Sequence, residues 1–61
     1  MEKDALINEI ESVTTYLLSM LESSGVFTLE DKDYWFFYGI DKQLENINID
    51  ISAYRMSKVD S

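Results

Sequence analysis

Apolar side chains recur at alternating spacings of three and four residues along most of this chain, and this period limits the fold more than any other feature. In the second half the spacings are 3, 4, 3, 4 and 3, through Phe37, Ile40, Leu44, Ile47, Ile51 and Tyr54. Such a row is typical of the seam along which one helix packs nearly antiparallel on another. It predicts a helix over about residues 29–56, with these six residues as its core or dimer seam.

The first half of the chain shows the same helical period. From Lys3 to about Ser23 an apolar stripe runs through Leu6, Ile10, Val13, Leu17 and Met20, and it is broadened by Ile7, Leu18 and Leu21. Polar residues, among them Glu11 and Glu22, fall on the opposite side. This arrangement predicts an amphipathic helix over about residues 3–23.

Residues 24–28 interrupt the two helical patterns. Gly25 suits the left-handed backbone conformation that ends many helices. Thr28 has the hydroxyl of an N-cap residue, and Glu30 and Asp31 would then lie in the first turn of the next helix. We therefore expect a loop over 24–28 and a frayed end over 57–61. Residues 1–61 form one all-α domain in this interpretation, a two-helix antiparallel hairpin.

The short length of the chain limits how a hairpin can be stabilised. A chain of 61 residues buries little apolar surface, and it contains no Cys for a disulfide and neither Cys nor His for an ordinary zinc site. We therefore expect a homodimer in which two hairpins complete a four-helix bundle. The chain also shows no apolar run near the ~20 residues of a membrane span, so we expect a cytoplasmic protein.

The charge of the chain is strongly acidic. Twelve Asp and Glu against five Lys and Arg give a formal net charge of -7. Such a chain repels phosphate backbones, which disfavours direct binding to nucleic acid. A basic surface on another protein is the natural complement of this charge.

A second apolar strip is predicted on the outer side of the 29–56 helix. At 100° per residue it contains Trp35, Tyr38, Ile49, Ala53 and Met56, with Tyr34 and Phe36 beside it. The strip is open to two interpretations, a dimer interface or a set of aromatic anchors for a different protein. Gly39, in the middle of this helix, either marks a close backbone approach or is a tolerated imperfection.

Acidic residues accompany these aromatic side chains. Carboxylates that resemble phosphates would fit a basic groove, although helix capping and an ordinary wet helix side also explain them. The predicted partner-binding set is Tyr34, Trp35, Tyr38, Glu30, Asp31, Asp33, Asp41 and Glu45. No catalytic residue, metal ligand or cofactor is predicted, because the chain lacks His, Cys and any phosphate-binding or dinucleotide-binding motif.

Two families show a resemblance to this chain. Its length, acidic balance and two-helix plan resemble plasmid copy-control proteins of the Rop type, which are dimeric four-helix bundles. A second resemblance is to the Hha/YmoA type of small modulators, which bind nucleoid-associated silencer proteins. It rests on Phe27, Leu29 and Asp31, on Phe37 and Tyr38, and on Asp41 and Leu44. The chain departs from that family where Lys42 and Gln43 replace a His-Arg pair.

These features predict a small, acidic, non-enzymatic regulatory or inhibitory protein, encoded by a phage or another mobile element. It would bind a basic surface of a host nucleic-acid-binding protein, as an anti-defence protein or nucleic-acid mimic. The alternative is a structural or oligomerisation module, or a modulator of gene expression similar to the Rop or Hha type.

Overall fold

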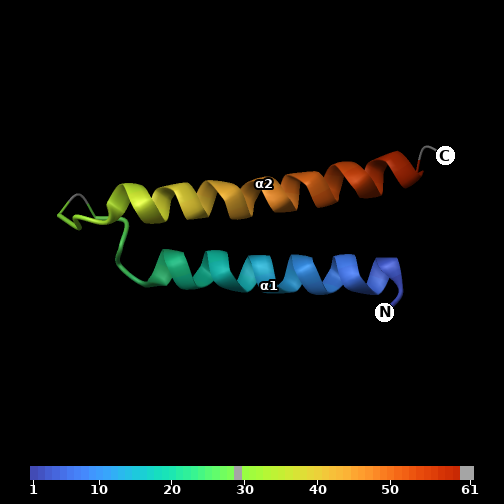
Figure 1. Cartoon of the computed structure of the whole chain (residues 1–61), viewed down its shortest axis with the longest axis horizontal. Coiled ribbons are helices and arrows are strands. Elements are labelled where there is room, and N and C mark those ends of the chain that lie inside the picture. Colours follow the sequence, from blue (N-terminus) through green and yellow to red (C-terminus); the bar gives the residue numbers. More distant parts are fainter. Residues whose placement is uncertain (29, 60–61) are drawn as a thin grey trace.

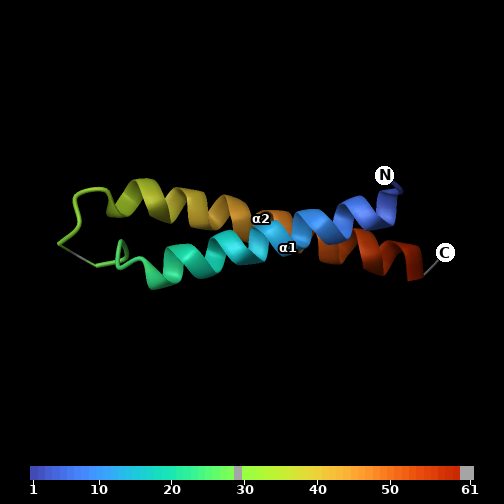
Figure 2. The ribbon, with the colours of Figure 1, turned by 90° about the horizontal axis from the view of Figure 1, so that it is seen from below.

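The computed structural model describes residues 1–28 and 30–59, and these residues form two helices and no strand. The helices α1 (Lys3–Ser23) and α2 (Tyr34–Val59) pack against each other. They run side by side in opposite directions, so that both ends of the chain lie at the same end of the hairpin (Figure 1). Seen from the perpendicular direction, they cross at a shallow angle (Figure 2). The predicted all-α hairpin is confirmed.

Helix α1 has clear limits at both ends. It begins after Glu2, which is extended and whose carbonyl oxygen accepts a hydrogen bond from the Leu6 amide at 2.9 Å. It ends at Ser23, and the hydroxyl of the following residue, Ser24, donates to the Leu21 carbonyl oxygen at 2.7 Å. Gly25 follows with φ of 83°, the left-handed conformation expected from the sequence.

Helix α2 begins at Tyr34, five residues later than predicted, and Thr28 is not its N-cap. Residues 30–33 form turns instead of helix. The Asp31 carboxylate accepts a hydrogen bond from the Asp33 amide at 2.7 Å, and the Asp31 amide donates to the Thr28 carbonyl oxygen at 3.1 Å. An Asp side chain that bonds to nearby backbone competes with helix formation, which explains the delayed start. Leu29 lies outside the described residues.

The C-terminal end of α2 extends beyond the predicted limit. The helix continues to Val59 instead of ending near Met56, so residues 57–59 are helical and not frayed. The Ser57 hydroxyl donates to the Tyr54 carbonyl oxygen at 2.9 Å, and Lys58 lies in the last turn, where a positive charge suits the helix dipole. Residues 60–61 of the predicted frayed end lie outside the described residues.

The described residues form a single layer of two helices. The hairpin measures 48 × 21 × 13 Å, and its thinnest dimension is close to the ~10–12 Å diameter of one helix with its side chains. Its radius of gyration is 14.4 Å, whereas a compact domain of this length would have roughly 10–11 Å. Most domains bury their core between two packed layers. Here neither broad face of the hairpin is covered by another part of the described chain.

Packing between the helices follows a heptad spacing but leaves a very small core. The shielded side chains of α1 are Ile7, Glu11, Thr14, Leu18 and Leu21, and the matching row of α2 is Phe37, Asp41, Leu44, Asn48, Ile51 and Arg55. Among the described residues only Thr14 and Ile51 fall below a tenth of full exposure, at 4% and 8%. The apolar stripe predicted for α1, from Leu6 to Met20, stays 40–50% exposed because α1 turns the neighbouring row toward α2.

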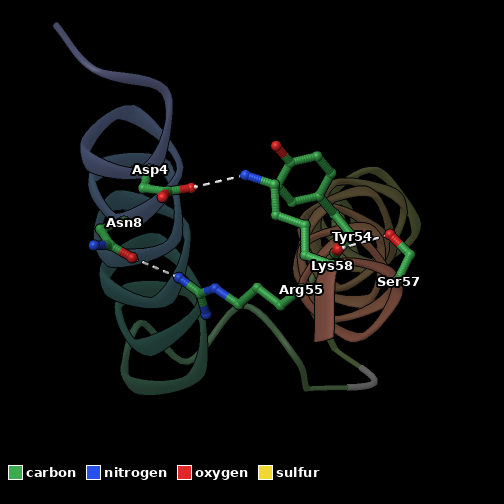
Figure 3. A network of polar contacts seen from close by, with 6 residues as sticks. All are labelled: Asp4, Asn8, Tyr54, Arg55, Ser57 and Lys58. Atoms are coloured by element: carbon green, nitrogen blue, oxygen red, sulfur yellow. Dashed lines mark hydrogen bonds and ion pairs between the residues drawn. The ribbon is translucent and has the colours of Figure 1, made fainter. Parts of the chain in front are cut away.

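Polar contacts join the helices near the two chain ends (Figure 3). The Arg55 guanidinium donates to the Glu11 carboxylate at 2.9 Å and to the Asn8 side-chain oxygen at 2.6 Å. The Lys58 ammonium lies 3.4 Å from the Asp4 carboxylate. Because these side chains are about half exposed, they fix the alignment of the helices more than they add to stability.

Candidate functional site

One broad face of the hairpin is apolar over both helices, and we call it the apolar face. Its members are exposed or half-buried hydrophobic side chains at helical spacing, namely Leu6, Ile10, Val13, Leu17, Met20, Phe36, Ile40, Ile47 and Tyr54. Four of the nine come from α2, where Ile40, Ile47 and Tyr54 belong to the predicted seam. The remaining seam residues lie nearer to α1, with Ile51 buried and Phe37 and Leu44 half-buried.

Two grooves show that the stripes of α1 and α2 open on the same side. The larger, of about 410 Å³, lies at the loop end and brings Leu17 and Met20 of α1 beside Ile40 of α2. The second, of about 280 Å³, lies nearer the chain ends and brings Ile10 beside Ile47 and Tyr54. Asp50 is the one ionisable carboxylate that lines either groove. The apolar face is therefore continuous across the hairpin and almost free of charge.

The opposite face contains a groove of different chemistry, which we call the acidic groove. It has a volume of about 380 Å³ and is lined by Leu18, Glu22, Phe27, Tyr34, Tyr38, Asp41 and Glu45. Its aromatic wall is ordered by ring contacts. The Tyr34 and Tyr38 rings are stacked at 6.1 Å, and the Phe27 ring meets Tyr34 edge-on at 6.0 Å.

The carboxylates of the acidic groove influence each other. The pKa of the Asp41 carboxyl is raised, first by loss of hydration and then by its neighbour Glu45, with a smaller contribution from Glu22. The Lys42 ammonium opposes this rise. Lys42 also lies 3.1 Å from the Glu45 carboxylate and 5.1 Å from the centre of the Tyr38 ring. The rim of the groove thus already holds one cation of the chain between a carboxylate and an aromatic ring.

The structure brings together only part of the predicted partner-binding set. Tyr34, Tyr38, Asp41 and Glu45 line one groove. Trp35 stands beside them, 75% exposed, with its ring 5.0 Å from Tyr34 and 5.5 Å from Tyr38.

Three of the predicted acidic residues do not line the groove. Glu30, Asp31 and Asp33 lie in the connection between the helices. The Asp31 carboxylate is occupied there by the Asp33 amide.

The groove residues that come from the first half of the chain were not predicted from the sequence. Glu22 and Leu18 enter it from the last turns of α1, and Phe27 enters from the loop. A hairpin places the end of its first helix beside the start of its second. The usable indication was therefore the position of Glu22 in the last turn of α1, whereas its assignment to the wet side predicted that it points away from α2.

The outer strip of α2, formed by Trp35, Tyr38, Ile49, Ala53 and Met56, is less continuous than the apolar face. Ile49 and Met56 are 62% and 69% exposed, but the ion-paired Lys42 and Glu45 separate them from the aromatic end of the strip. A Cβ atom added at Gly39 would meet nothing within 4 Å. No close backbone approach therefore requires glycine there within the hairpin.

No protein-family model, no curated protein and no solved structure matches this chain. Over residues 1–28 and 30–59, no three acidic side chains gather in a group that could hold a metal ion. Neither described helix combines the length and the apolar character needed to cross a membrane. The two faces differ in chemistry. One is apolar and has a single carboxylate, Asp50, in its grooves, whereas the other combines aromatic rings with carboxylates.

Proposed function

We propose that this chain is a non-catalytic binding protein that acts as a homodimeric four-helix bundle and engages a basic surface of another protein. The observation that carries the proposal is the acidic groove, in which Glu22, Asp41 and Glu45 surround stacked tyrosine rings. A Lys or Arg side chain can lay its cation on an aromatic face and donate hydrogen bonds to carboxylates at the same time.

The electrostatics of the groove support a cationic occupant. The raised pKa of Asp41 reflects loss of hydration first, and then the repulsion from the neighbouring Glu45 and Glu22. A bound cation relieves that repulsion. The position of Lys42 between Glu45 and Tyr38 shows that an ammonium group fits this chemistry. The net charge of -7 adds long-range attraction toward a basic partner.

The proposed partner is a host nucleic-acid-binding protein in the cytoplasm. Its basic groove normally receives phosphates, and the carboxylates of this chain take their place. The action is then regulatory or inhibitory, of the kind that an anti-defence protein of a phage or other mobile element exerts. Exclusion of nucleic acid from the partner's groove is the expected mechanism.

A second candidate function is favoured by the apolar face. A structural or oligomerisation module needs an apolar surface that spans both helices, and this chain has one. In that case the geometry of the oligomer is the function, as in a module similar to the Rop type, and the acidic groove is a solvated surface.

Charge-matched variants separate the two functions. The groove variant carries Glu22→Gln, Asp41→Asn and Glu45→Gln, and the control carries Gln at the exposed Glu2, Glu9 and Glu30. Both lose three charges, so a difference between them reports position and not net charge. The probe is a fluorescent peptide rich in Lys and Arg, and its dissociation constant is measured by fluorescence anisotropy at low salt.

We expect the groove variant to bind the peptide about tenfold or more weakly than the parent chain, because each charge-assisted hydrogen bond is worth roughly 1.5–3 kcal/mol. The control should lose no more than about threefold. Equal losses of peptide affinity in the two variants would mean that the peptide binds through general charge attraction. That result would favour the structural module.

A further inference from the structure

The hairpin is one layer thick, and its apolar face is covered by nothing in the described chain. We infer that a second copy of this chain covers it, so that two hairpins pack face to face through Leu17, Ile10 and Ile47 and the side chains around them. This inference rests on the proposed homodimer and assigns its interface. From the sequence alone, the candidates for that role were the six-residue seam of α2, which includes Ile40, Ile47 and Tyr54, and the outer strip of α2.

The size of the apolar face matches what a stable dimer needs. Eight of its side chains are 37–64% exposed. Together they present on the order of 700 Å² of surface per copy, against roughly 800 Å² per partner in a standard interface. Burial of such an area by an identical face also gives the closed two-fold symmetry that most homodimers adopt.

The pattern of apolar residues within each helix supports the same arrangement. In α1, Leu18 and Leu21 turn toward α2, while Leu17 and Met20 form a neighbouring stripe that α2 leaves exposed. A helix that packs on one neighbour needs one narrow stripe, whereas a bundle helix with two neighbours needs a wider apolar sector. Packing against α2 alone does not require the wide apolar sector of α1, whereas packing in a four-helix bundle does.

Charge favours a second copy over a basic protein at this face. Asp50 is the one carboxylate in its two grooves, so the face offers little to select Lys or Arg. Face-to-face packing keeps most acidic side chains of the two copies away from the contact. Both acidic grooves then point outward, and the dimer presents two equivalent binding sites to a partner.

The outer strip of α2 is a poorer interface by the same criteria. It lies on a single helix, and the Lys42–Glu45 ion pair interrupts it. Burial of that pair would remove two charges from water without a new partner for either. We therefore expect the outer strip to remain exposed in the dimer.

Sedimentation equilibrium on matched variants tests the assignment. The face variant is Leu17→Gln with Ile47→Gln, and the control is Ile49→Gln with Met56→Gln on the outer strip. The parent chain and the control should sediment at twice the 7.1 kDa chain mass, and the face variant should dissociate at least about 100-fold more readily. A monomeric parent chain would overturn both this inference and the proposed homodimer. A dimer that the control variant breaks and the face variant leaves intact would overturn the inference alone.

A second measurement uses the unsubstituted protein, so it tests the inference even if the face variant does not fold. Met20 lies on the apolar face and Met56 on the outer strip, and they are 50% and 69% exposed in the single chain. Mild peroxide oxidation followed by peptide mass spectrometry compares them in the native protein, with Met1 as an exposed reference. We expect Met20 to be protected at least about fivefold relative to Met56 at high protein concentration, and to lose that protection on dilution. Similar oxidation rates for the two at every concentration would overturn the inference.

Discussion

The two broad faces of the hairpin are built from neighbouring positions of the same helices, yet their chemistry is opposite. Ile40 lines the apolar groove and Asp41, the next residue, lines the acidic groove. Leu17 and Leu18 divide in the same way on α1. Successive residues of a helix are rotated by about 100°, so one residue of each pair lies on the polar surface and the next lies on the apolar surface, or the reverse.

This difference is the basis for the different roles that we propose for the two faces. The carboxylates and tyrosine hydroxyls of the acidic groove still reach water in a single hairpin, although Asp41 loses part of its hydration, so the groove needs no partner to be stable. The apolar face exposes side chains of the size that normally form a core, and no second layer covers them. In the proposed function, the apolar face therefore serves the assembly of the dimer, and the acidic groove serves the recognition of a partner.

The largest effect is expected at Ile51, because this residue lies between the two faces and is the most buried apolar side chain described. Ile51→Ala should lower the free energy of unfolding by about 2–4 kcal/mol, measured by urea denaturation. The control Ile49→Ala, on the exposed outer strip, should change it by less than about 0.5 kcal/mol. Equal losses would mean that the outer strip is as buried as the core in the native assembly.

Salt should act on the two faces with opposite sign. Screening weakens the repulsion between two copies of net charge -7, so dimerisation should strengthen by about twofold or more when salt rises from roughly 0.05 to 0.5 M. The same change should weaken binding of the basic peptide by about tenfold or more. Sedimentation and anisotropy titrations measure the two constants. A parallel response of both would contradict the division of roles.

The effect of Gly39→Ala should be a modest gain in stability. A Cβ at this position has open space in the hairpin, and Ala is favoured over Gly within a helix by about 0.5–1 kcal/mol. Thermal unfolding followed by circular dichroism measures the gain. If the substitution instead weakens the dimer, Gly39 lies at the contact between copies and the interface extends beyond the apolar face.

The smallest effect concerns the titration of Asp41. Its pKa is raised in the folded chain, so the folded state binds this proton more tightly than the unfolded state. Stability should therefore increase as the pH falls from about 7 through the folded pKa toward the ordinary Asp value. Asp41→Asn should raise the free energy of unfolding at pH 7, and this gain should shrink as the pH falls to about 3. The control Glu9→Gln removes one charge away from the groove but keeps Asp41, so its stability should retain the pH dependence of the parent chain.

Much of the fold could be predicted from sequence because local spacing determines it. The period of three and four residues gave both helices, and Gly25 marked the end of α1 through its backbone freedom. The start of α2 could not be predicted in this way, since Asp31 can cap a turn or occupy a helix. In the structure the Asp31 carboxylate accepts a hydrogen bond from the Asp33 amide, and this bond stabilises the turn.

The site was harder to predict because it depends on which rows face each other. Two adjacent apolar rows on α1 fit the same period, and spacing alone does not tell which one meets α2. The structure selects the row of Leu18 and leaves that of Leu17 exposed. The contribution of Glu22 to the acidic groove follows from this choice, since it enters beside Leu18.

The most direct test of the assignment of faces is an isotope-filtered nuclear Overhauser experiment on a mixture of labelled and unlabelled chains. Contacts between copies appear in it without interference from contacts within one chain. We predict intermolecular contacts from the methyl groups of Leu17, Ile10 and Ile47, and none from Ile49 or Met56. Intermolecular contacts confined to Ile49 and Met56, or absent altogether at concentrations where the protein sediments as a dimer, would contradict the account.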